Sequence, residues 1–178
     1  MLAWLRTNKY VAMVMLFVRV YLGYQWIGGG WHKLTGGFDA TGFLTNAINN
    51  PIANATTQKL VYPNFVYFIE HFALPNVKLF NFIIPIGELL VGIGLILGGL
   101  TAAAAFFGLL MNFMFMFAGT LNTNPWLVLL GGIVLFAGTN AGRYGLDYYL
   151  LPLMRKVLKF KKLDGDGKMT PAGTAKAH

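Results

Sequence analysis

The sequence predicts an all-α membrane protein whose core is a four-helix transmembrane bundle, with short amphipathic helices in a long outer segment between spans 1 and 2. The chain is 56% hydrophobic and only 11% charged, whereas about a quarter of the residues in a soluble domain are charged. Its apolar residues gather in four runs, each close to the roughly 20 residues that a membrane crossing requires. Basic residues flank the first and last of these runs, as expected for a multi-pass protein.

The four spans are expected at about residues 10–30, 79–98, 100–119 and 125–142. A secretory signal peptide is the competing interpretation of the first run. That run exceeds the usual apolar core of about 7–15 residues, and it ends in Gly28-Gly29-Gly30-Trp31-His32-Lys33 rather than in a small-residue cleavage site. The very short connection at Gly98-Gly99 predicts an antiparallel hairpin of the second and third spans.

The distribution of charge predicts a multi-pass membrane protein with both termini in the cytoplasm; the expected location is a bacterial or archaeal cell membrane. Residues 1–9 form a basic flank, residues 10–150 the four-span domain, and residues 151–178 a basic cytoplasmic tail that is disordered at its end. The connection at 121–124 carries no charge. The formal charge of +8 is attributed to contact with anionic lipid headgroups, and no nucleic-acid partner is expected. The tail cations are Arg155, Lys156, Lys159, Lys161 and Lys162.

The outer segment, residues 31–77, is too long to be a bare loop in a compact domain. Asn50-Pro51 has the pattern of a helix cap followed by a first-turn proline, and Pro63 can open a further helix. Apolar residues between Phe65 and Phe72 recur at helical spacing. One to three short helices are therefore expected on the outer membrane surface.

Two charged residues fall within the spans, Arg19 and Glu88. Measured from Gly30 and Leu79, they lie ~16 Å and ~13 Å below the outer boundary, at 1.5 Å per residue. They are therefore expected to form an ion pair near the midplane, whose role is either structural or catalytic.

Each span has one face of small or polar residues, as close helix packing in lipid requires. At the inner boundary, Arg143 and Asp147 are expected to form an i,i+4 pair. The four faces are Arg19, Gly23, Trp26, Gly30 and Lys33 on the first span; Asn81, Pro85, Glu88, Gly92 and Gly99 on the second; Ala105, Gly108, Asn112 and Gly119 on the third; and Gly132, Phe136, Thr139 and Arg143 on the fourth.

The sequence offers no haem, flavin, iron–sulfur or metal site. Cysteine is absent, and none of the three histidines lies within a span, so axial haem ligation has no candidate. The glycines of Gly92-x-Gly94-x-x-x-Gly98 lie inside an apolar span with no preceding strand, which excludes a dinucleotide loop. Asp164-Gly-Asp166 begins like a calcium loop but lacks the later ligands.

The first span from Arg19 to Lys33 and the stretch from Gly87 to Gly98 resemble the first two helices of the DoxX/DoxD family of small four-span membrane proteins. One branch of that family is the large subunit of a thiosulfate:quinone oxidoreductase, which joins two thiosulfates into tetrathionate and reduces membrane quinone. The resemblance implies a redox membrane protein that passes electrons from a small anionic donor or a partner to quinone. A partner would be a small subunit or a soluble oxidoreductase, and an oligomer is also compatible with the sequence.

On this interpretation Arg19 and Glu88 are the expected catalytic residues. Substrate binding is assigned to Trp26, His32, Lys33 and Asn112, and the lining of a quinone slot to Phe113 and Phe117 together with Trp26. Two alternatives remain open: a non-enzymatic membrane anchor or scaffold for a soluble oxidoreductase, and a small solute carrier, although no inverted repeat is evident.

Overall fold

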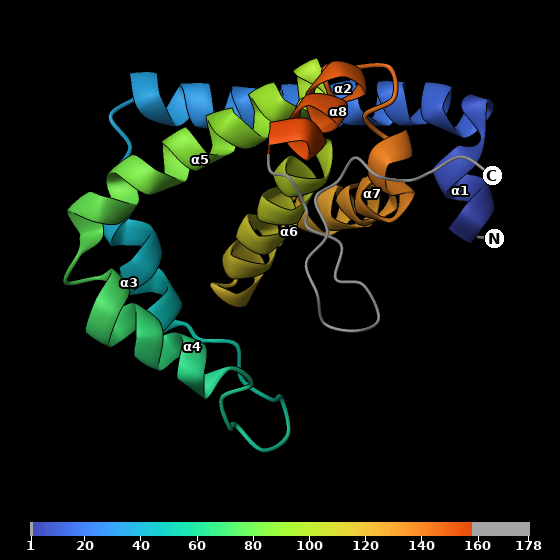
Figure 1. Ribbon diagram of the computed structural model, residues 1–178. Coiled ribbons are helices and arrows are strands. Elements are labelled where there is room, and N and C mark those ends of the chain that lie inside the picture. Colours follow the sequence, from blue (N-terminus) through green and yellow to red (C-terminus); the bar gives the residue numbers. More distant parts are fainter. Residues whose placement is uncertain (1, 158–178) are drawn as a thin grey trace, which may run out of the picture.

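The computed structural model describes residues 2–157, and this part of the chain is built almost entirely from helices (Figure 1). The predicted disordered end of the tail and the cations from Lys159 onward lie outside the described residues. The only extended pairing in 2–157 is an isolated antiparallel bridge between Ala53 and Leu60. The helices are α1 (Leu2–Thr7), α2 (Lys9–Thr35), α3 (Thr41–Asn49), α4 (Pro63–Phe68), η1 (Ile69–Ala73), α5 (Val77–Leu97), α6 (Thr101–Phe117), α7 (Asn124–Ala137), η2 (Gly138–Asn140) and α8 (Asp147–Val157).

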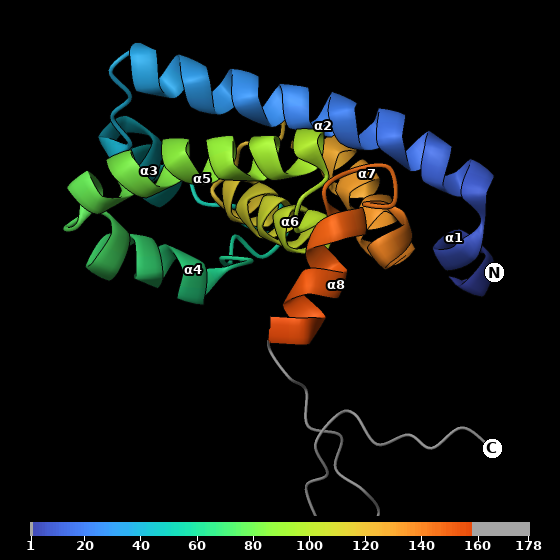
Figure 2. The ribbon, with the colours of Figure 1, turned by 45° about the horizontal axis from the view of Figure 1, so that its top comes forward.

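The four longest apolar helices pack in a ring. Helix α2 packs on α5 and α7, and α6 packs on the same two helices from the other side; the long α2 lies alongside α5 in both views (Figures 1 and 2). All four predicted helices are present. Within the described residues, α2 and α5 are long and apolar enough to cross a membrane by themselves, whereas α6 and the combined α7–η2 segment are shorter apolar helices.

The contact between α2 and α5 depends on glycines. A Cβ built on Gly23 would lie 2.8 Å from the carbonyl oxygen of Gly92, and a Cβ on Gly30 would lie 2.9 Å from that of Pro85. No side chain fits at such separations, so the two backbones approach as closely as small residues allow. The predicted inward face of the first span is therefore confirmed at Gly23 and Gly30, and these contacts set the register of the two helices.

The hairpin between α5 and α6 is confirmed. Gly98 has φ +64° and Leu100 has φ +51°, so the chain reverses through two left-handed residues. The carboxylate of Asp147 accepts hydrogen bonds from the backbone N–H groups of Leu100 (2.6 Å) and Thr101 (2.9 Å). Asp147 thus satisfies free N–H groups at the start of α6.

The predicted Arg143–Asp147 pair is wrong because no continuous helix joins the two residues. Helix α7 ends at Ala137 and passes into a short 3-10 turn after Gly138, whose φ is +58°. Arg143 instead donates to the carbonyl oxygen of Thr7. The α-helix therefore ends about five residues before the expected end at residue 142, although Ala141 is still buried in the core of the bundle.

The outer segment contains α3, α4 and the π-helical turn η1, which lie at the far end of α5 (Figures 1 and 2). Pro63 opens α4 as predicted, but α3 ends at Asn49 and no helix follows Pro51. A hydrogen-bonded clip joins this segment to α5: Asp39 accepts from the Asn81 side-chain amide (3.1 Å), and Asn81 accepts from the Ala40 backbone N–H (2.7 Å). The segment forms a second small core, made of Ala40, Leu44, Ala47, Ile69 and Ala73, which packs with Ala118 at the end of α6.

Candidate functional site

The charged partner of Glu88 is Lys33. The Lys33 Nζ lies 2.7 Å from both carboxylate oxygens of Glu88. The Glu88 side chain is 4% exposed and that of Lys33 27%. Side chains on a helix point back toward its N-terminus, which brings the Lys33 ammonium over Gly29, one turn earlier. Gly29 leaves room there, since a Cβ at this position would lie 3.4 Å from Glu88 Oε2 and 3.8 Å from Lys33 Nζ.

The predicted ion pair between Arg19 and Glu88 is wrong. The Arg19 guanidinium lies against Gly98, where any added Cβ would collide with it. Gly98 is ten residues beyond Glu88 on α5, a difference of ~15 Å along the helix. The depth argument failed because it took Gly30 as the outer end of the first span. Helix α2 instead continues to Thr35, and Gly30 packs against Pro85, well inside α5.

Arg19 holds the opposite end of the bundle together. Its residue is 1% exposed, and its guanidinium donates to the carbonyl oxygens of Ala141 (3.4 Å) and Tyr144 (3.0 Å), in the turn after α7. A buried guanidinium that donates to backbone carbonyls ties together segments far apart in the sequence. Arg19 therefore lies far from Glu88, and its hydrogen bonds go to backbone carbonyl oxygens of the same protein.

A cavity of about 280 Å³ surrounds the Lys33–Glu88 pair. It brings together four residues predicted for the site: Trp26 and Lys33 from α2, Glu88 from α5 and Asn112 from α6. Asn112 is 2% exposed, and its Oδ1 has no hydrogen-bond partner within the described residues. A buried amide oxygen without a donor costs free energy. The cavity wall therefore carries an unmet acceptor in addition to the ion pair.

Besides Arg19, three of the predicted residues lie outside this cavity. His32 is exposed and does not line it. Phe113 is 40% exposed. Phe117 lines a separate hollow with Tyr62 and Phe65, whose rings contact its own in a tilted and an edge-to-face arrangement, respectively. Phe113 and Phe117 thus lie apart from the cavity that holds Glu88, and their role in lining a quinone slot stays a prediction.

The aromatic wall of the cavity comes from other residues, namely Phe38, Phe43 and Phe115. The Lys33 Nζ lies 5.8 Å and 5.9 Å from the ring centroids of Phe38 and Phe115, close enough for cation–π attraction. Helical spacing could have identified Phe115, because it is three residues from Asn112 and shares its face, whereas Phe113 does not. No pattern in the sequence placed Phe38 or Phe43, because both belong to the folded outer segment.

The residues 2–157 contain no group of three or more histidine or acidic side chains that could hold a metal ion. The site is thus a small cavity inside a helical protein of apolar exterior, with one buried carboxylate, one partly exposed ammonium and one buried amide. A charged pair at such a position within apolar helices is a feature of integral membrane proteins with a polar interior.

The family model of DoxX matches residues 14–121. This range covers more than half of the chain and contains Lys33, Glu88 and Asn112, so the protein belongs to the DoxX family and is a membrane protein. Comparison with curated proteins and with solved structures found no match.

Proposed function

We propose that this protein is a quinone-reducing membrane subunit, which takes electrons from a small anionic donor such as thiosulfate, or from a partner, and passes them to membrane quinone. The Lys33–Glu88 pair in the polar cavity is the observation that supports this proposal most strongly. Buried charges within apolar helices are costly and are the usual mark of a functional site in membrane proteins.

The chemistry of the cavity suits an uncharged quinone headgroup. The charges of Lys33 and Glu88 compensate each other, so the cavity has no net charge that would attract a dianion. A quinone carbonyl can accept a hydrogen bond from the Lys33 ammonium, where negative charge develops on reduction. The hydroxyl of the quinol product can donate to Asn112 Oδ1, the acceptor that has no partner within the described residues.

The overall reaction on this proposal balances. Two thiosulfates form one sulfur–sulfur bond and release two electrons, and the quinone takes up these electrons and two protons to become quinol. Glu88 is the proposed group that relays protons to the quinone oxygens. The anionic donor, being excluded from the neutral cavity, is proposed to act outside it, at the exposed His32 that precedes Lys33 in the chain.

The proposed topology has α2, α5, α6 and the α7–η2 segment all crossing the membrane, with both termini cytoplasmic. The α6 helix and the segment Asn124–Asn140 each have 17 residues, at the lower end of the range that spans a bilayer. The basic flanks support the orientation. This orientation places the end of the bundle that holds Lys33, together with α3 and α4, on the outer side of the membrane.

The test is thiosulfate-dependent reduction of a short-tailed quinone by the purified protein in nanodiscs. Glu88→Gln should lower kcat by at least about 100-fold, the usual contribution of a positioned acid or base. Glu70→Gln is the matched control, because Glu70 is exposed and lies outside the cavity. Equal turnover by the two variants would refute the role of Glu88, and absence of turnover by the wild-type protein would favour a membrane anchor for another oxidoreductase.

A further inference from the structure

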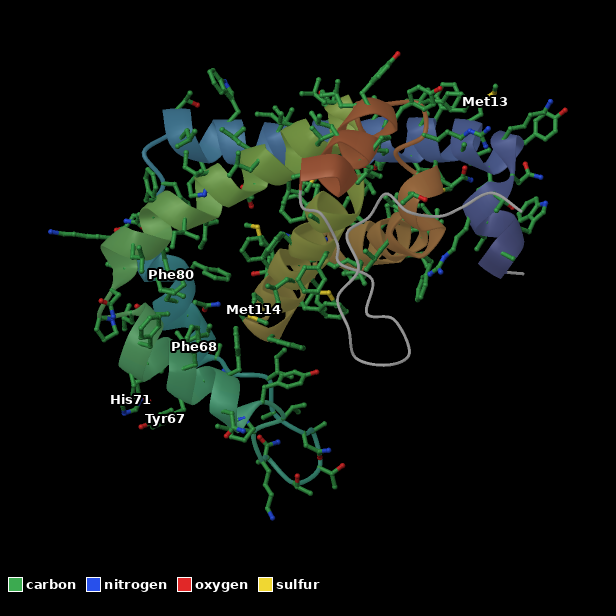
Figure 3. The ribbon with its side chains drawn as sticks, in the orientation of Figure 1. Met13, Tyr67, Phe68, His71, Phe80 and Met114 are labelled. Carbon is green, nitrogen blue, oxygen red and sulfur yellow. The ribbon has the colours of Figure 1, made fainter. Side chains whose placement is uncertain are left out.

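A second, larger hollow lies beside the polar cavity. It has a volume of about 690 Å³, and it is bounded by α5 and α6 on one side and by α3, α4 and η1 on the other. Every residue that lines it is apolar. Figure 3 shows Phe68, Phe80 and Met114, from α4, α5 and α6, turned toward this space, whereas Tyr67 and His71 point away from it. We call it the apolar groove.

The apolar groove and the polar cavity share a wall. Phe43, Ile84 and Phe115 line both. The rings of Phe43 and Phe115 meet edge to face, with centroids 6.1 Å apart. The boundary between the polar and apolar compartments is therefore made of side chains from α3, α5 and α6, without any intervening backbone layer.

From this wall the groove runs along α6 toward the hairpin, where Leu100 and Ala103 line its far end. Asn112 and Leu100 are twelve residues apart, so the groove extends ~18 Å from the level of the polar cavity. Leu90 and Phe107 line it and are 64% and 55% exposed. In a membrane, exposed apolar residues on apolar helices face lipid chains, so the groove opens sideways into the bilayer.

We propose that one long-tailed quinone occupies both compartments, with its headgroup at the Lys33–Glu88 pair and its isoprenoid tail in the apolar groove, and that it enters from the membrane between α5 and α6. This proposal rests on the proposed function and adds the position and path of the substrate tail. A phospholipid fits less well, because its phosphate would meet the Glu88 carboxylate in a cavity of only about 280 Å³.

Only side chains separate the two compartments, so one molecule can occupy both once the rings of Phe43 and Phe115 turn aside. A tail transferred from lipid into the groove gains little hydrophobic free energy, because lipid is equally apolar. Its contribution is instead to fit the groove and hold the head at Glu88, which raises the effective concentration of the head there. Bulk added within the groove should therefore impair long-tailed quinones selectively.

The test compares Ala103→Phe with Ala102→Phe. Both alanines are exposed neighbours on α6, but only Ala103 lines the groove. The ratio of KM for a quinone with a tail of several isoprene units to KM for its short-tailed analogue should rise at least about fivefold in Ala103→Phe and stay unchanged in Ala102→Phe. A photoreactive group at the end of the long tail should label the Leu100 end of the groove in the wild-type protein.

The outcomes separate the two proposals. If short-tailed quinone is reduced but the two variants have the same KM ratio, or if the tail probe labels all apolar faces equally, the tail path is refuted and the proposed function stands. If no quinone of either length is reduced, the proposed function fails. In that case the tail probe can still label the groove at Leu100. If excess phospholipid abolishes this labelling and excess quinone does not, the groove is a lipid site and the quinone assignment is overturned.

Discussion

The Lys33–Glu88 pair predicts an asymmetric response to the removal of its two partners. In Lys33→Met the Glu88 carboxylate, 4% exposed, loses the only hydrogen-bond donor that it has within the described residues. Leaving one buried charge without its partner costs about 3 kcal/mol or more. In Glu88→Leu the Lys33 ammonium, whose side chain is 27% exposed, can turn toward water, so the cost should be only about 1 kcal/mol.

The double variant Lys33→Met/Glu88→Leu removes both charges together. Its stability should return to within about 1 kcal/mol of the wild-type value, because apolar side chains of similar volume replace buried ion pairs at little cost. The single substitutions would then be non-additive by about 3 kcal/mol, a coupling expected only for residues in direct contact. SDS-induced unfolding in mixed micelles, followed by far-UV circular dichroism, measures all four proteins. The account is refuted if Glu88→Leu costs as much as Lys33→Met, or if the two costs simply add.

Three further predictions concern the frame around the site. Gly23→Ala should lower the free energy of unfolding by about 1–3 kcal/mol because the added methyl group forces α2 away from α5. Gly28→Ala, with no atom within 4 Å of the new Cβ, should be neutral or stabilising in the same assay. Equal effects of the two substitutions would contradict the close contact between α2 and α5. Arg19→Gln should destabilise the protein by about 2–4 kcal/mol yet leave the quinone affinity of the folded protein unchanged, and a matching loss of affinity would restore Arg19 to the site. Asp39 accepts hydrogen bonds from the Thr41 backbone N–H and hydroxyl and from Asn81, which hold its pKa below the ordinary value of 3.8. Its contribution to stability should therefore be complete above pH ~4 and be lost as the pH falls through the lowered pKa; Asp39→Asn should lack this loss, and identical acid profiles would refute the clip.

The helices were predictable because their signals are local. Long apolar runs, the Gly98-Gly99 turn and the glycine spacing of the first span depend on neighbours along the chain, and the structure has helices at these places. The inward face of the fourth span was not predictable in the same way. Phe136 is 60% exposed, and a Cβ added to Gly132 would have no atom within 4 Å. Lipid and protein interior are equally apolar, so small residues alone do not show which side of a helix is buried.

The site was predictable in its residues more than in its pairing. Trp26, Lys33, Glu88 and Asn112 were all identified, and all line one cavity. Their ion pair was assigned wrongly because a depth argument needs the relative register of two helices, which the contacts of Gly23 and Gly30 set in three dimensions. The contribution of Phe43 depended on how the outer segment folds back, and no local pattern carries that information.

The central claim is that a quinone headgroup binds in the cavity beside Trp26, and the fluorescence of Trp26 measures this most directly. Trp4, Trp31 and Trp126 are 55–62% exposed, so replacing all three by phenylalanine should leave a folded protein with Trp26 as its only tryptophan. Short-tailed quinone should quench its emission saturably, and Glu88→Gln should weaken that binding. A companion protein that keeps only Trp31 should show unsaturable collisional quenching. If Trp26 behaves as Trp31 does, the headgroup does not bind in this cavity.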